Sequence, residues 1–467
     1  MGTAFSETRS TGDEGPWAPF VPTTEAPWDL PRVVHLHRRA GFGATWDEIQ
    51  RDLADGPSAS VERLLAGKAR AQGVPEDFEA TAAALADAAV IGRDAGRLKA
   101  WWVYRMLFGP DPLTERLTLL WHNHFATSNE KVNNLAAMRR QNELFRRFAR
   151  APFGRLLEAA IRDPALLVWL DAPANRKGHP NENLARELME LFTLGIGHYT
   201  EHDVKEAARA LTGWTVADGR FTELPALHDD GAKSVLGRAG RWRGQDLARI
   251  LLEHPATARR LAGRVCELFL GEGAVEERAV QALADGLSER RLDVGWAVAT
   301  VLRSRAFFAD GNLGNRVPGP CEFLVGSARA LEMLADPPST LALADWAARL
   351  GQDLFHPPNV GGWPGGRAWV TTRAVIARAN FADALVTGKT IGRRQALDAR
   401  GLARRHGRGK DLDDLTAFFA ELLTGTSQTA AWRARIRSGI DPKAKDEGEI
   451  ERRAVALILA SPEVQLA

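Results

Sequence analysis

The sequence predicts an all-α protein, a multi-helix globular array with long irregular loops and at most a minor β-hairpin. Three observations support this fold class. One segment places four apolar residues and a histidine on a single helix face: Leu113, Leu117, Leu120, Trp121 and His124, at the spacing i, i+4, i+7, i+8 and i+11. Capping residues and prolines mark where such helical segments begin. Segments rich in proline and glycine, too irregular for a helix, separate them.

Residues 1–27 are polar and rich in proline, glycine and threonine, which predicts an extended N-terminal arm. Trp17 and Phe20 indicate that this arm packs across the body of the protein. Residues 28–467 are expected to form one large helical domain, with a candidate sub-boundary near 215–245. No internal repeat of fixed period is found.

The first helices carry clear start signals. Thr45 with Glu48 forms a predicted capping box after the glycine loop at 41–43. Asp111 caps a strong helix whose first residue is Pro112. Further helices are expected at 58–66, up to Phe108, at 132–149 and at 153–162.

Residues 180–214 predict two helices joined by a glycine turn. Asn181 is expected to cap the first helix, and Gly195 supplies its left-handed stop. Thr200, with Asp203 three residues later, resembles a capping box for the second helix.

The second half of the chain contains two conspicuous loops. Residues 215–245 lack helical periodicity, and Asp218-Gly219 indicates a short β-hairpin there. A loop of this length in a compact domain is often functional. The segment F-H-P-P-N-V-G-G-W-P-G-G-R-A-W, residues 355–369, is too rich in proline and glycine to be helical. Helices are expected at 246–308, 322–334, 341–351 and, with two charged interruptions, beyond.

Composition argues against several classes of protein. Lys+Arg of 61 against Asp+Glu of 59 leaves a net charge of +2, which is no electrostatic footprint for nucleic acid or an anionic membrane. No stretch approaches the ~20 apolar residues of a transmembrane helix. Cys266 and Cys321 lie in apolar helical contexts and are predicted to be buried thiols. The first residues show no signal peptide, so the expected location is cytoplasmic, with export alongside a signal-bearing partner as the alternative.

The H-x-H pair in W-H-N-H-F, residues 121–125, is a candidate metal site. On a continuous helix His122 and His124 point about 160° apart, since each residue turns the chain by ~100°. Both serve one site only if the helix ends at Trp121 or is buried on two sides. The alternatives are a hydrogen-bonded core histidine at 124 and a surface or second-face residue at 122.

Glu187 and Glu190 are three residues apart on the helix that follows Asn181, so their carboxylates can converge. Helical glutamates at this spacing bind metals or perform acid–base work. The alternative is a solvated face, because Arg186 has a glutamate four residues away on either side. Asn183 shares this polar arc.

The loop L-H-D-D-G-A-K, residues 227–233, carries an imidazole, two carboxylates and an ammonium. His228 with Asp229 or Asp230 is a candidate for metal ligation or general-base work, with Lys233 nearby. The alternative is an ordinary turn, because Asp-Gly is a turn dipeptide.

Trp363 and Trp369, with the glycines between them, are candidates for lining a pocket. The alternative is simple packing of a long loop. The chain has no G-x-S-x-G elbow, Walker A loop or dinucleotide-binding glycine pattern.

Six segments carry a resemblance to a known family, and they read R-A-G-F-G-A-T (39–45), L-T-E-R-L-T-L-L-W-H-N-H-F (113–125), P-N-E-N-L-A-R-E-L-M-E-L-F-T-L-G (180–195), A-A-R-A-L-T-G-W (207–214), H-D-D-G-A-K (228–233) and P-P-N-V-G-G-W-P-G-G (357–366). Together they resemble the bacterial DUF1800 family, in the family's order. That family has no established activity. The resemblance implies a DUF1501-type protein as a partner, because the two are often encoded side by side. It also implies export for many members, from which this chain departs by showing no signal.

The first expectation for function is an enzyme in which helix 112–125, the helix from Asn181 and the 227–233 loop converge on a polar pocket. The expected catalytic and substrate-holding groups are Glu187, Glu190, Arg186, Lys233 and Asp229. The expected metal ligands are His122, His124, Glu190 and His228. Such ligands suit a divalent Zn, Mn or Fe ion, and a hydrolase and an oxidoreductase both remain open. The second expectation is a non-catalytic binding or scaffold partner of a DUF1501-type protein or a saccharide.

Overall fold

The computed structural model describes residues 15–70 and 73–467 and is built almost entirely of helices. The described α-helices are α1 (Leu30–Ala40), α2 (Trp46–Leu65), α3 (Phe78–Ile91), α4 (Ala95–Phe108), α5 (Pro112–His124), α6 (Asn129–Val132), α7 (Leu135–Arg147), α8 (Phe153–Ala160), α9 (Pro164–Trp169), α10 (Asn183–Glu187), α11 (Glu201–Ala210), α12 (Gly244–Leu252), α13 (Pro255–Phe269), α14 (Glu277–Glu289), α15 (Val294–Arg303), α16 (Pro320–Ala330), α17 (Thr340–Arg349), α18 (Thr372–Thr387), α19 (Ala399–Arg405), α20 (Leu412–Thr424), α21 (Ala430–Ser438) and α22 (Glu447–Ala460). Short 3₁₀ turns are η1 (Ala172–Ala174), η3 (Pro225–Leu227), η4 (Asp310–Asn312) and η5 (Gly366–Trp369), whereas η2 (Leu188–Thr193) is a π-helical segment. The predicted all-α class is confirmed.

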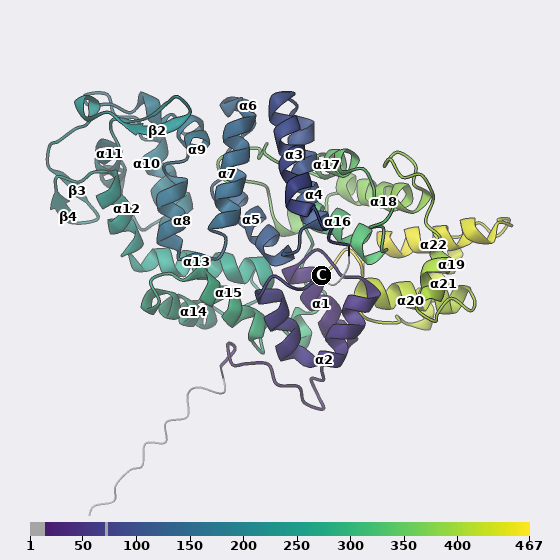
Figure 1. Cartoon of the computed structure of the whole chain (residues 1–467). Coiled ribbons are helices and arrows are strands. Elements are labelled where there is room, and N and C mark those ends of the chain that lie inside the picture. Colours follow the sequence, from purple (N-terminus) through teal and green to yellow (C-terminus); the bar gives the residue numbers. More distant parts are fainter. Residues whose placement is uncertain (1–14, 71–72) are drawn as a thin grey trace, which may run out of the picture.

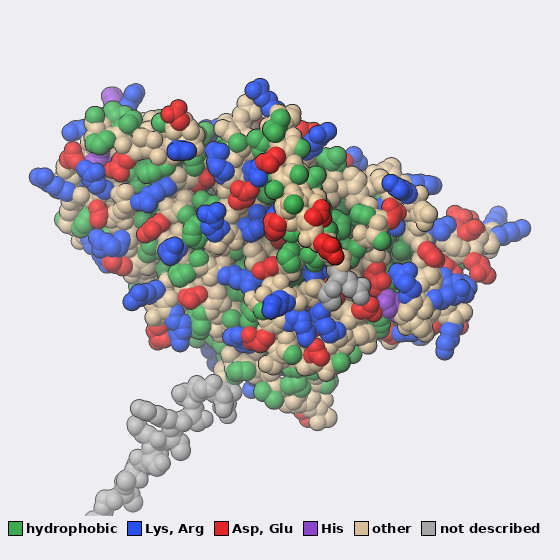
Figure 2. All heavy atoms as spheres, in the orientation of Figure 1, with side chains coloured by type: hydrophobic (Ala, Val, Ile, Leu, Met, Phe, Trp, Pro, Cys, Tyr) green, Lys and Arg blue, Asp and Glu red, His purple; other side chains and the backbone are tan. Residues whose placement is uncertain are grey.

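The helices form two flanks around a central group (Figure 1). Helices α8 to α15 make one flank, α16 to α22 make the other, and α1 to α7 lie between them. None of the described helices is both long and apolar enough to cross a membrane. On the face shown in Figure 2, basic and acidic side chains are interspersed.

The predicted helix starts are present. Thr45 and Glu48 form a reciprocal capping box at α2, and Thr200 and Asp203 form one at α11. The Asp111 side chain accepts a hydrogen bond from the backbone of α5, whose first residue is proline. Each cap satisfies backbone N–H groups that a helix cannot satisfy itself, which is why these residues fix the start of the helix.

The predicted hairpin is also present. Strands β1 (Trp214–Ala217) and β2 (Arg220–Glu223) pair antiparallel, with Trp214 opposite Glu223. Asp218 and Gly219 have φ of 51° and 68°, the positive pair that a type I′ turn requires. A second hairpin, of β3 (Lys233–Val235) and β4 (Arg238–Gly240), was not predicted for this loop.

The helix predicted from Asn181 differs from expectation. Its α-helical part covers only Asn183–Glu187, and it continues as the π-helical η2. Asn181 accepts from the N–H of Asn183 at 3.0 Å but is not the residue that precedes the first helical one. A π-helix bonds i to i+5, so a helical wheel drawn at 100° per residue loses its phase beyond Leu188.

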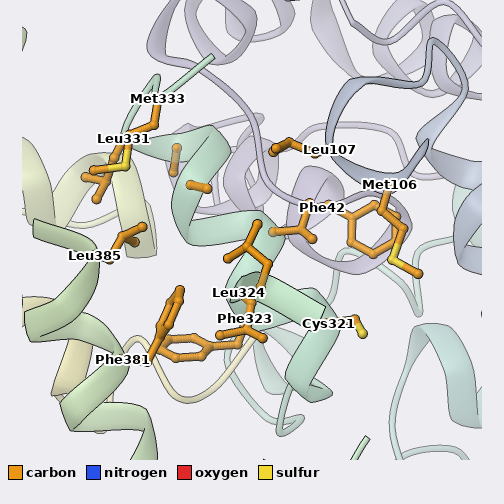
Figure 3. Packing of buried hydrophobic residues seen from close by; sticks show 14 of the residues in the cluster. Phe42, Met106, Leu107, Cys321, Phe323, Leu324, Leu331, Met333, Phe381 and Leu385 are labelled. Atoms are coloured by element: carbon orange, nitrogen blue, oxygen red, sulfur yellow. The ribbon is translucent and has the colours of Figure 1, made fainter. Parts of the chain in front are cut away.

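Two hydrophobic clusters fill the protein, and α5 contributes to both. Leu119 belongs to the cluster built around α4, α16, α18 and α22, whereas Leu120 belongs to the one around α8 and α13. In the first cluster, α16 packs between α4 and α18, and Phe323 meets Phe381 edge to face at 5.6 Å (Figure 3).

The described part of the N-terminal arm, residues 15–27, lies along the body of the protein. The Trp17 indole donates to the carbonyl of Ala279 at 2.8 Å, and the Phe20 N–H donates to Arg303 at 2.8 Å. Residues 1–14 of the predicted arm lie outside the described residues.

Asp163 couples the stability of this fold to pH. Its buried carboxylate caps α9 by accepting from Leu166 N at 3.0 Å, and it accepts from Gln141 Nε2 at 2.7 Å. Burial raises its pKa to about 6, although both hydrogen bonds oppose the shift. The folded state therefore holds the proton more tightly than an unfolded aspartate, whose pKa is about 3.9. The resulting stabilisation is fully present below about pH 4 and is lost as the pH rises through about 6.

We expect Asp163→Asn, which keeps the oxygen acceptor without its charge, to flatten the dependence of Tm on pH between about 4 and about 7. Asp163→Ala loses the cap and is expected to be about 1 kcal/mol less stable than the parent protein. Thermal unfolding followed by circular dichroism across this range checks both. A parental pH slope in Asp163→Asn would refute the assignment of the slope to this carboxyl group.

Candidate functional site

A polar pocket of about 200 Å³ lies at the seam between the two hydrophobic clusters. One face of α5 supplies Arg116, Leu119, Leu120 and Asn123, which are spaced at i, i+3, i+4 and i+7. The other walls come from α13, the start of α16 and the 355–369 loop. We call this the arginine pocket, and its polar and aromatic lining comprises Arg116, Asn123, Arg264, Glu267, Glu272, Arg316, Glu322, Gln352, Trp363 and Trp369.

A shared carboxylate forms the floor of the arginine pocket. Glu322 accepts two hydrogen bonds from Arg316, at 2.6 and 2.7 Å, and its Oε1 lies 2.5 Å from Arg116 Nη1. Burial opposes ionisation of Glu322, but Arg116 and Arg316 lower its pKa to about 2. Glu322 is therefore ionised at any physiological pH, and two guanidinium groups from distant parts of the chain converge on it.

Positive charge around Glu322 exceeds negative charge. Burial and then repulsion by Arg316 lower the pKa of Arg39, with Glu322 acting in the opposite direction. Burial likewise lowers the pKa of Arg38 and of Arg378 to about 10, and Glu322 is the carboxylate that opposes the shift in each. Buried cations without matching anions are costly, because the protein interior solvates charge poorly.

Several guanidinium N–H groups of this cluster have no acceptor among the described residues. They include Arg116 Nη2, Arg39 Nε and Arg378 Nε. The side chain of Arg116 is only 1% exposed and lines the arginine pocket, and its Nη2 is a buried donor without an acceptor among the described residues. Arg39 is otherwise held by the carbonyls of Phe269 and Asn312, at 3.0 Å each.

The glycine-rich loop fits closely against α5. Asn123 Oδ1 accepts from the N–H of Trp363 at 2.6 Å. A Cβ on Gly362 would lie 2.2 Å from that oxygen, and the φ of Gly362 is +89°. Only glycine combines this conformation with such close approach. Asn123, between the two histidines of W-H-N-H-F, therefore positions the wall that carries Trp363.

The mouth of the arginine pocket is acidic and aromatic. Glu267 and Glu272 are exposed, whereas Trp363 and Trp369 are 4% and 8% exposed and present only part of their rings. Arg264 Nη1 lies 3.5 Å from Glu267 Oε2. The two tryptophans line the pocket and also pack in the first hydrophobic cluster, so the prediction of a pocket and its alternative, packing of the loop, both hold.

His122 and His124 lie on opposite faces of α5, which continues through His124. His124 Nε2 donates to the carbonyl of Phe192 at 3.0 Å, and its ring meets Phe125 edge to face. His122 Nε2 lies 3.0 Å from Asn142 Nδ2, and its ring lies between Trp102 and Phe145. Burial lowers the pKa of both histidines well below the usual value, so both are neutral. His124 is the hydrogen-bonded core histidine that the alternative predicted, whereas His122 lies on the second face of the helix but is buried and not at the surface.

Arg186 is held by two glutamates other than Glu190. It donates to Glu201 twice at 2.8 Å and to Glu182 at 2.9 Å. Glu190 instead accepts from the hydroxyl of Tyr199. Glu187 is half-buried, and burial followed by the charge of Glu190 raises its pKa. The two carboxylates therefore influence each other, as their spacing predicts.

The 227–233 loop closes on α11 and on itself. Buried His228 donates from Nδ1 to the carbonyl of Thr212 at 3.0 Å. Asp229 accepts from Arg209 Nε at 2.8 Å, and this hydrogen bond lowers the pKa of Asp229 to about 2. Lys233 Nζ donates to the carbonyls of Asp229 and Gly231.

The three segments expected to converge do not form one metal centre. Among residues 15–70 and 73–467, no group of three or more His, Cys, Asp or Glu side chains is placed to hold a metal ion. The expected ligands His122, His124, Glu190 and His228 therefore remain in separate environments. The catalytic roles of Glu187, Glu190, Arg186, Asp229 and Lys233 stay predictions, and none of these side chains lines the arginine pocket.

Sequence reasoning missed the arginine floor, although one signal for it was present. Arg116 lies three residues after Leu113 and four before Leu120, so it belongs to the apolar stripe of its helix. A charged residue inside an apolar stripe indicates a buried ion pair or a site. Its partners, at 316 and 322, are too distant in sequence for any spacing rule to find.

We expect Gly362→Ala to destabilise the protein by about 1–3 kcal/mol, because the methyl group clashes with Asn123 and the positive φ is strained. Urea unfolding measures the loss. Gly311→Ala is the control, since a Cβ there meets no atom within 4 Å, and its effect should stay within about 0.5 kcal/mol. Equal stability of the two variants would contradict the close approach of the loop to α5.

Comparison with known families places the chain. The model of a family described as protein of unknown function (DUF1800) matches residues 35–466. No curated protein matches the chain, and no solved structure does. Because the family match covers nearly all of the 467 residues, the chain belongs to the DUF1800 family.

Proposed function

We propose that this protein binds a small organic anion in the arginine pocket. The observation that carries the proposal is the buried, unpaired Nη2 of Arg116 beside the pocket, within a cluster that has more arginines than carboxylates. A bound anion would accept from this donor and supply the missing negative charge. Planar guanidinium groups suit carboxylate, phosphate and sulfate oxygens, which they contact in pairs.

The rest of the pocket supports an organic ligand rather than a bare ion. Its volume of about 200 Å³ leaves room for more than the anionic group alone. Trp363 and Trp369 offer apolar ring surface, whereas Asn123 and Gln352 add amide groups. A mostly apolar or mixed wall with a few fixed polar groups is the usual form of a small-molecule site.

Binding is better supported than catalysis. The two carboxylates at the mouth, Glu267 and Glu272, are exposed and able to accept hydrogen bonds from a ligand. An enzymatic role for Glu187, Glu190 or His228 would require a separate site, because those side chains do not line this pocket.

We expect glucuronate and citrate to raise Tm in a concentration-dependent way, and neutral glucose to leave it unchanged. The protection should weaken at high salt, because electrostatic binding is screened. Arg264→Gln should weaken the affinity for glucuronate roughly tenfold, since one charge-assisted hydrogen bond contributes about 1.5–3 kcal/mol. Differential scanning fluorimetry and titration calorimetry provide the measurements.

The matched control is Arg278→Gln, whose side chain is 84% exposed and lies outside the pocket. It should bind like the parent protein. Arg116→Lys keeps the charge but loses the planar fork, so it tests the floor of the pocket with the least risk to folding. Equal protection by anions in all variants, or equal protection by glucose, would rule out this pocket as the binding site.

A metal-dependent activity and a DUF1501-type partner are further proposals that need their own tests. Metal content of the purified protein, compared with His124→Ala and Glu190→Ala, tests the first. Substoichiometric metal in all three proteins would remove it. Co-purification with a DUF1501-type protein, with Trp363→Ala as the variant, tests the second.

A further inference from the structure

We infer that the ligand of the arginine pocket is an acidic oligosaccharide whose chain continues along α13 into a neighbouring hollow. This inference rests on the proposed function and names its ligand class. It starts from a second hollow lined by His198, Arg259, Arg260, Gly263, Val275 and Glu277. This hollow adjoins the arginine pocket, because three residues line both of them: Arg264, Glu267 and Gly271.

One face of α13 forms the base of both hollows. Arg260, Gly263, Arg264 and Glu267 follow the spacing i, i+3, i+4 and i+7, which places them along a single stripe, and Gly271 follows just beyond the end of the helix. At a rise of about 1.5 Å per residue, the stripe from Arg260 to Glu267 is about 10 Å long. That length exceeds one monosaccharide and suits a short chain.

Gly263 keeps the path between the two ends open. A Cβ built at this position meets no atom within 4 Å, and its φ is not positive. The helix therefore does not need glycine here for conformation or for packing, although glycine lowers helix stability. The absent side chain leaves space at the point where a ligand would pass.

The charges along the stripe favour a sugar over an acidic peptide. Cations alternate with carboxylates: Arg259 pairs with Glu277 at 2.7 Å, and Arg264 lies near Glu267. The carboxylates would repel a peptide whose side chains are all anionic. They would accept hydrogen bonds from the hydroxyl groups that an acidic sugar carries between its charges. At the other end, buried Trp363 and Trp369 line the arginine pocket and supply an apolar ring edge to a sugar there.

The test compares galacturonate monomer, dimer and tetramer by titration calorimetry on the full chain. We expect the tetramer to bind at least roughly tenfold more tightly than the monomer, a gain equal to about 1.4 kcal/mol. Gly263→Leu fills the path and should abolish the gain while leaving the monomer affinity within about twofold. Gly263→Ala, the matched control, should retain most of it. Arg259→Gln should weaken only the tetramer.

Each outcome bears on one of the two proposals. Binding of the monomer with no gain from chain length, or a gain that survives Gly263→Leu, would overturn the extended groove but leave the arginine pocket intact. Tighter binding of tetra-glutamate than of tetragalacturonate would overturn the saccharide class. Failure of every galacturonate to bind, the monomer included, together with failure of citrate, would overturn the proposed function itself. Neutral maltotetraose should bind at least roughly tenfold more weakly than the acidic tetramer.

Discussion

The carboxylate of Glu322 is the interaction on which the centre of this protein depends. It forms ion pairs with Arg116 of α5 and with Arg316 of the loop before α16. Its charge also favours the charged forms of Arg39 and Arg38 on α1, because it opposes the lowering of their pKa values by burial. Removing one partner of such a buried network costs about 3–5 kcal/mol, because the remaining charges are left unpaired. The helices that the network joins belong to both hydrophobic clusters, so Glu322 fixes the seam between them.

The same network explains why a pocket forms at that seam. Apolar side chains fill the two clusters on either side, but guanidinium groups cannot be covered by them without a large desolvation penalty. The glycine loop closes the space from one side, held by the hydrogen bond between Asn123 and Trp363, and α13 closes it from another. A cavity that keeps a donor of Arg116 unpaired is unfavourable for stability alone, and such local costs are typical of sites that bind a ligand.

Local rules predicted the elements well because the relevant residues are neighbours in sequence. Two capping boxes act within one helical turn, Thr45 with Glu48 and Thr200 with Asp203. The hairpin turn at Asp218-Gly219 follows from the tolerance of these two residues for positive φ. The rules failed where tertiary contacts decide. The wheel built on Glu187 and Glu190 assumed an α-helix throughout, whereas the chain is π-helical from Leu188 to Thr193.

The residues of the candidate site divide in the same way, into those that sequence patterns indicate and those that only tertiary contacts bring together. Trp363 and Trp369 were candidates for lining a pocket, with packing of the glycine-rich loop as the alternative, and they line the pocket while also packing in the first cluster. Arg116 and Glu322 were not predicted, because 206 positions separate them in a chain with 61 basic and 59 acidic residues. His122 and His124 have the spacing of a metal-binding pair, but α5 continues through both, so they point to opposite faces and bond to different partners.

An anion held by the Arg116 cluster is detected most directly by anomalous diffraction from crystals soaked in selenate. The excess of arginine over carboxylate predicts an anomalous peak within about 3.5 Å of Arg116 Nη2, at the floor of the arginine pocket. Selenate bound only at surface lysines and arginines, with Arg116 Nη2 bonded to a protein acceptor, would contradict it.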